Sequence, residues 1–69
     1  MRFNIGDIVR ISKKSGYYGE DECNPKDMDG EIVETDSREI GITYPIKVQW
    51  DNGESCVFRE IDLKLRRRA

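Results

Sequence analysis

The stretch that decides the fold is VQWDNGESCVF, residues 48–58, in which two partly apolar runs flank a polar turn at residues 51–53. Such an arrangement, with Asn-Gly in the turn, predicts a β-hairpin. A two-residue Asn-Gly loop would leave Phe58 on the polar face of the hairpin. A three-residue loop with the glycine in the left-handed conformation instead pairs Val48 with Cys56. We therefore expect the longer loop.

The alternation continues toward the N-terminus of this hairpin through YPIKVQW, residues 44–50, whose large apolar groups fall on one face. The longer loop then pairs Ile46 with Phe58 and leaves Trp50 opposite Glu54, at the end of the apolar face. There the indole either plugs the end of the core or forms an exposed aromatic platform. The sequence leaves both arrangements open.

Three further segments have strand character: DIVRISKK (residues 7–14), GEIVET (residues 30–35) and the end of REIDLKL (residues 59–65). The polar residues 15–29 predict one long first loop, and residues 36–43 predict a second. We expect an all-β, five-stranded antiparallel sheet that is strongly bent. Its predicted core comprises Val9, Ile11, Ile32, Ile46, Val48, Phe58, Leu63 and Leu65.

Charge is distributed unevenly along the 69 residues, which are enough for one domain. Residues 1–62 carry 8 Lys/Arg against 14 Asp/Glu, whereas residues 63–69 carry 4 Lys/Arg and no acid. The domain is therefore expected to span residues 1–65, followed by a basic tail at 66–69. An acidic body disfavours broad binding to duplex nucleic acid but leaves a local contact through the tail open.

The residue types argue against catalysis. The chain has no histidine, which removes the usual general base and a common metal ligand. Cys23 and Cys56 lack the paired spacing of a zinc ribbon or a thiol oxidoreductase. We expect no enzyme activity, no metal and no cofactor. The absence of a long apolar run predicts a cytoplasmic protein that makes no membrane contact.

The order of five short strands, a long first loop, a tight hairpin between the third and fourth strands and a short turn before the fifth resembles the SH3-like small barrel. VQWDNG followed by FREIDLKL is similar to barrels of the Mind-bomb type, and GDIVRI with DGEIV is similar to KOW-type barrels. SGYYGEDECNP, WDNG and DLKL together resemble small bacterial and bacteriophage proteins of this type. The resemblance implies an SH3-like barrel, and it is compatible with peptide, nucleic-acid and assembly roles. The position of the single tryptophan, at the end of the third strand, departs from signalling SH3 domains and puts polyproline recognition in doubt.

The favoured function is a protein-interaction or adaptor module, because adjacent aromatic rings in a long loop suit a contact surface. The alternative for these rings is that they cover the core. The predicted partner-binding residues are Tyr17, Tyr18, Glu20, Asp21, Tyr44 and Trp50.

The second candidate function is a KOW-like barrel that binds nucleic acid. Its phosphate contacts would come from Arg66, Arg67 and Arg68, and Tyr17 or Trp50 would stack on bases. A structural subunit that completes its core only in an assembly is a third reading. In the first two cases we expect a monomer or a weak homo-oligomer.

Overall fold

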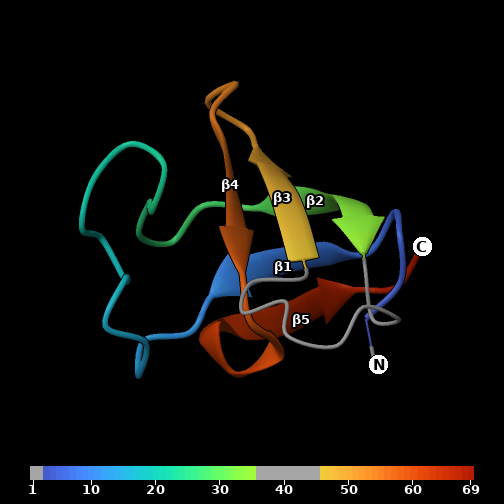
Figure 1. Ribbon diagram of the computed structural model, residues 1–69, viewed down its shortest axis with the longest axis horizontal. Coiled ribbons are helices and arrows are strands. Elements are labelled where there is room, and N and C mark those ends of the chain that lie inside the picture. The colour runs from blue at the N-terminus through green and yellow to red at the C-terminus, as the bar shows by residue number, and fades with distance from the viewer. Residues whose placement is uncertain (1–2, 36–45) are drawn as a thin grey trace.

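Figure 1 shows the computed structural model, which describes residues 3–35 and 46–69. Within these ranges the chain forms five β-strands and one short 3-10 helix. In chain order they are β1 (Ile8–Ile11), β2 (Gly30–Thr35), β3 (Ile46–Trp50), β4 (Ser55–Phe58), η1 (Glu60–Asp62) and β5 (Leu63–Arg67). No helix in the described residues is long and apolar enough to cross a membrane. The predicted second loop and Tyr44 lie outside the described residues.

The five strands form one antiparallel sheet in the order β4-β3-β2-β1-β5. The first strand therefore lies between β2 and the last strand, β5, as the ribbon in Figure 1 shows. Strands β4 and β5 form the two edges, and no ladder joins them in the part of the chain that the structure describes. The prediction of an all-β, five-stranded antiparallel fold is confirmed, but the sheet is not closed.

Along the strands, apolar residues alternate with residues that face outward, and these apolar residues point to the same face of the sheet. The core lies on that face. Every predicted core residue is buried except Leu65, which is only half-buried and packs against the others. Phe3 and Trp50 are buried as well, at 2% exposure each. The sequence pattern missed Phe3 because it precedes the first strand, where no alternation marks the inward face.

The β3–β4 hairpin has the predicted register, with Ile46 opposite Phe58 and Val48 opposite Cys56. The N–H of Gly53 donates to the carbonyl of Trp50 at 2.9 Å, and the N–H of Trp50 donates to the carbonyl of Glu54 at 2.7 Å. Gly53 has a φ of +89°, so it adopts the left-handed region that favours glycine. The three-residue loop is therefore confirmed.

The long first loop is held against the hairpin by side chains of the turn region. The Trp50 indole N–H donates to the carbonyl of Cys23 at 2.9 Å, and the Asn52 side-chain amide donates to the carbonyl of Glu22 at 3.0 Å. Further along the loop, the N–H of Asp51 donates to the carbonyl of Asp29 at 3.1 Å. These bonds tie the loop to the hairpin before the chain enters β2.

The C-terminal residues belong to the sheet further than the sequence predicted. Strand β5 continues through Arg67, which pairs with Ile8 of β1 across a register shift. Beyond it, the N–H of Ala69 donates to the buried carboxylate of Asp7 at 2.8 Å. The boundary drawn at residue 65 is therefore too early, because Arg66 and Arg67 belong to the last strand.

Candidate functional site

Trp50 is part of the core. Its ring packs edge-to-face on Phe58 with centroids 5.6 Å apart, and its indole N–H is bonded to a loop carbonyl. Only 2% of the residue is exposed. Of the two arrangements that the sequence left open, the structure has the plug. A surface-exposed aromatic platform at Trp50 is not present in this fold.

The two loop tyrosines are half-buried. Tyr17 packs edge-to-face on Phe58 with centroids 6.5 Å apart. Tyr18 packs against the core and donates its hydroxyl to Asp27 Oδ1 at 3.0 Å. Burial raises the pKa of the Tyr18 phenol, and the bond to Asp27 raises it further. Both rings therefore cover the core, which was the alternative to a role in partner contact. Each ring also keeps part of its surface exposed.

The predicted acidic contacts are exposed, and one of them has a local structural role. Asp21 Oδ1 accepts hydrogen bonds from the backbone N–H of Cys23 at 2.9 Å and from the backbone N–H of Asn24 at 3.0 Å. It also accepts one from the Asn24 side-chain amide at 3.0 Å. This is the way in which Asp side chains stabilise turns. Glu20 is exposed beside it.

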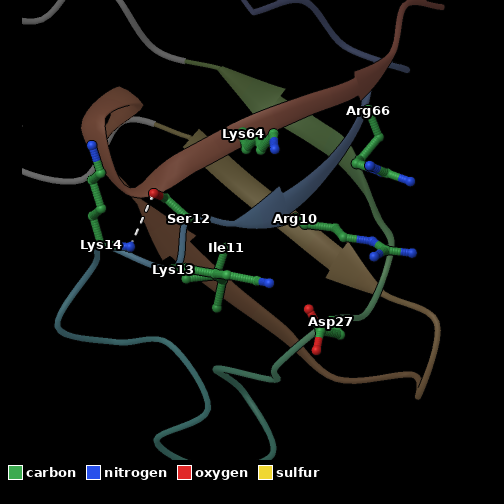
Figure 2. Close-up of a pocket in the computed structure, with 8 residues that line it drawn as sticks. All are labelled: Arg10, Ile11, Ser12, Lys13, Lys14, Asp27, Lys64 and Arg66. Atoms are coloured by element: carbon green, nitrogen blue, oxygen red, sulfur yellow. Dashed lines mark hydrogen bonds between the residues drawn. The ribbon is translucent and has the colours of Figure 1, made fainter.

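A groove of about 470 Å³ lies on a different part of the surface, where β1, the turn after it, β5 and the end of the first loop meet (Figure 2). Of the described residues, five cationic side chains and one carboxylate line it. The lining consists of Arg10, Ile11, Ser12, Lys13, Lys14, Asp27, Lys64 and Arg66. The groove is therefore strongly basic, although most of the chain is acidic.

Strand pairing is what concentrates this charge. Arg10 on β1 and Lys64 on β5 are direct partners in the antiparallel ladder. Lys64 and Arg66 alternate along β5 with the apolar Leu63 and Leu65, so they point away from the core. Like charges directly opposite each other in a sheet destabilise it. The pairing of Arg10 with Lys64 is therefore unfavourable for the stability of the sheet.

One carboxylate at the edge of the groove offsets part of the repulsion. Arg10 Nε lies 2.6 Å from Asp29 Oδ1, and Arg66 Nε lies 4.0 Å from the same oxygen. The hydrogen bond from Arg10 lowers the pKa of Asp29, and the same bond raises the pKa of Arg10. Asp29 therefore stays ionised and Arg10 stays cationic throughout the neutral range.

The structure divides the three arginines predicted for phosphate binding. Arg66 lines the groove, whereas Arg67 and Arg68 do not. Arg67 is exposed at the end of β5. The pKa of Asp7 is lowered mainly by the hydrogen bond from the N–H of Ala69, and the charge of Arg68 lowers it further. The sequence reading missed Arg10, Lys13, Lys14 and Lys64. The alternation of the two segments does place Arg10 and Lys64 on the outward face. Only the pairing of β1 with β5, however, brings the two residues together.

The two cysteines are free. Cys23 Sγ lies 3.7 Å from Glu54 Oε2, and burial, with help from that carboxylate, raises the pKa of the thiol. Among residues 3–35 and 46–69, no group of three or more His, Cys, Asp or Glu side chains is arranged to hold a metal ion. The raised pKa disfavours the thiolate form of Cys23.

Comparison of the chain with known protein families, with curated proteins and with solved structures found no match. The basic groove is the feature that most needs a functional explanation, because its charges are unfavourable for the fold itself.

Proposed function

We propose that this chain is a non-catalytic binding module of the SH3-like small-barrel type, whose basic groove holds the phosphate backbone of a nucleic acid. The observation that carries the proposal is the direct pairing of Arg10 with Lys64, beside Lys13, Lys14 and Arg66 in one groove. Phosphates would relieve this repulsion by neutralising the facing cations, with release of condensed counterions.

The chemistry of the lining favours phosphate over a protein surface. Among the described lining residues, Ile11 is the one apolar side chain, and it is only 3% exposed. Protein interfaces depend on buried aromatic and apolar anchors and are depleted in lysine. Nucleic-acid interfaces are polar and strongly positive. The lining of the groove is likewise polar and strongly positive.

The adaptor function expected from the sequence has less support. It relied on exposed aromatic rings, but Trp50 is buried and both Tyr17 and Tyr18 pack on the core. The exposed acids Glu20 and Asp21 are unsuited to phosphate, so they do not add to the attraction of a nucleic acid. A protein partner at the groove would have to be acidic.

The barrel type is supported by the order of elements. The long first loop, the tight β3–β4 hairpin and the one-turn η1 before β5 are all features of the order that resembles SH3-like barrels. In the sheet, β1 lies between β2 and β5, so the last strand of the chain pairs with the first. The groove lies at this β1–β5 junction.

Fluorescence anisotropy with a labelled single-stranded oligothymidylate tests the proposal. Binding should weaken linearly on a log–log plot against salt, by a slope of roughly 0.7 per phosphate contact. Lys64→Gln should weaken binding and reduce the slope by roughly one contact. Lys47→Gln on β3, outside the groove, removes the same charge and should have little effect. These single substitutions test the groove more specifically than deletion of residues 66–69, because the deletion would also remove part of β5.

Absence of binding at low salt, or equal effects of the two substitutions, would refute the proposal. Poly-glutamate provides the remaining comparison, since it carries negative charge without phosphate. If it displaces the oligonucleotide at an equal charge concentration, the partner is an acidic protein and not a nucleic acid.

A further inference from the structure

The two arginines of the basic groove converge on one carboxylate. Arg10 Nε is 2.6 Å and Arg66 Nε is 4.0 Å from Asp29 Oδ1. Figure 2 shows the side chains of Arg10 and Arg66 extending to the same side of the groove, away from Lys14. The guanidinium groups are therefore already engaged by an anion that belongs to the protein.

The fold holds this carboxylate in place. Asp29 immediately precedes β2, and its carbonyl accepts the N–H of Asp51 from the β3–β4 turn at 3.1 Å. Its backbone is thus fixed to the sheet, and its side chain lies at the edge of the groove. All three charged side chains remain partly open to solvent, with 32% of Arg10, 45% of Arg66 and 41% of Asp29 exposed.

A carboxylate and a phosphate compete for the same donors, because a guanidinium binds either through N–H groups in one plane. A solvent-exposed ion pair contributes little to stability and can exchange partners at small cost. Because Arg10 and Arg66 share one oxygen, a phosphate that displaces Asp29 gains access to two cations.

We infer that Asp29 is a built-in competitor of the ligand, which occupies Arg10 and Arg66 in the free protein and limits the affinity of the groove for phosphate. This inference rests on the function proposed above. It gives Asp29 a role opposite to that of a positioning residue, whose removal would weaken binding. The sign of a single substitution therefore distinguishes the two roles.

The test compares Asp29→Asn with Asp27→Asn, using the labelled oligothymidylate as probe. Each substitution removes one negative charge at the groove. Asp27 bonds the Tyr18 hydroxyl and acts on Arg10 through its charge, but among the described residues it makes no ion pair with Arg10 or Arg66. Asp27 has a φ of +53°, a conformation that asparagine also tolerates. Asp29→Asn should tighten binding roughly two- to fivefold, the equivalent of one exposed ion pair, and steepen the salt dependence. Asp27→Asn should tighten it less.

Weaker binding of Asp29→Asn, or equal tightening by both substitutions, overturns the role of Asp29 and leaves the proposed function intact. Failure of the wild-type protein and both variants to bind removes the proposed function itself. If Asp29→Asn does not fold, NMR of the Arg10 Nε–H in the wild-type protein decides. That signal should shift as oligonucleotide is added, and an unchanged signal at saturation would overturn the inference.

Discussion

Gly30 lies directly opposite Trp50 in the β2–β3 ladder, and the indole ring occupies the space that a side chain at position 30 would need. A Cβ atom there would overlap Trp50 Cε3 and would lie 2.6 Å from Val48 Cγ1. The ring can therefore fold over the end of the core only because residue 30 is glycine. The same position of the ring directs its N–H to the carbonyl of Cys23, which ties the first loop to the hairpin.

Gly30→Ala should destabilise the protein by about 1 to 3 kcal/mol, because the added methyl group forces Trp50 or the strand to move. Gly16→Ala is the matched control, since a Cβ at Gly16 meets nothing within 4 Å. Denaturant unfolding, followed by tryptophan fluorescence, measures both. Similar unfolding free energies for the two variants would show that the Trp50 ring does not need the space at position 30.

Gly53 isolates backbone strain from steric overlap. Its φ is +89°, but a Cβ there would meet nothing within 4 Å. Gly53→Val should cost about 1 to 3 kcal/mol through strain alone. Gly53→Asn should cost less, because asparagine tolerates positive φ better. If the valine variant melts at the wild-type temperature, the hairpin can form without a left-handed residue at this position.

Trp50 should behave as a core residue in a combined stability and binding experiment. Trp50→Ala should cost about 3 to 5 kcal/mol, which is comparable to the whole stability of a domain this small. Trp50→Phe keeps most of the packing but loses the hydrogen bond to Cys23. It should therefore lower the melting temperature without a specific effect on oligonucleotide binding. A binding loss in Trp50→Phe with unchanged melting would instead restore the contact role considered for this residue.

The buried carboxylate of Asp7 should make stability depend on pH. The N–H of Ala69 and then the N–H of Asn4 lower the pKa of Asp7 below its ordinary value of 3.8. A lowered folded-state pKa gives stabilisation that is present above the ordinary value and is lost as the pH falls through the folded-state pKa. Asp7→Asn should therefore lower the melting temperature at neutral pH by several degrees.

The difference between wild-type and Asp7→Asn melting temperatures should shrink in acid. Asp29 also has a lowered pKa, but both proteins contain it, so its contribution cancels in the comparison. Melting followed by circular dichroism over a range of pH provides the measurement. A difference that stays constant from neutral to strongly acid pH would mean that the charge of Asp7 does not contribute to holding the C-terminus.

The strands and the β3–β4 register could be read from the sequence because both depend on local information. Alternation with a period of two marks the inward face of each strand, and the turn residues set how the two arms of one hairpin face each other. Ile46 opposite Phe58 is such a relationship between near neighbours in the chain. The three-residue length of the β3–β4 loop and the all-β class followed from the same signals.

The groove was decided by tertiary structure. Alternation shows that Arg10 and Lys64 face outward, but it carries no information about which strand lies beside which. Only the pairing of β1 with β5 brings these two residues opposite each other, and that pairing depends on burial of the whole core. The burial of Trp50 likewise depends on the Cys23 carbonyl and on the space at Gly30, both distant in sequence. Local patterns determine the faces of the strands, whereas the packing of distant segments determines which charges meet.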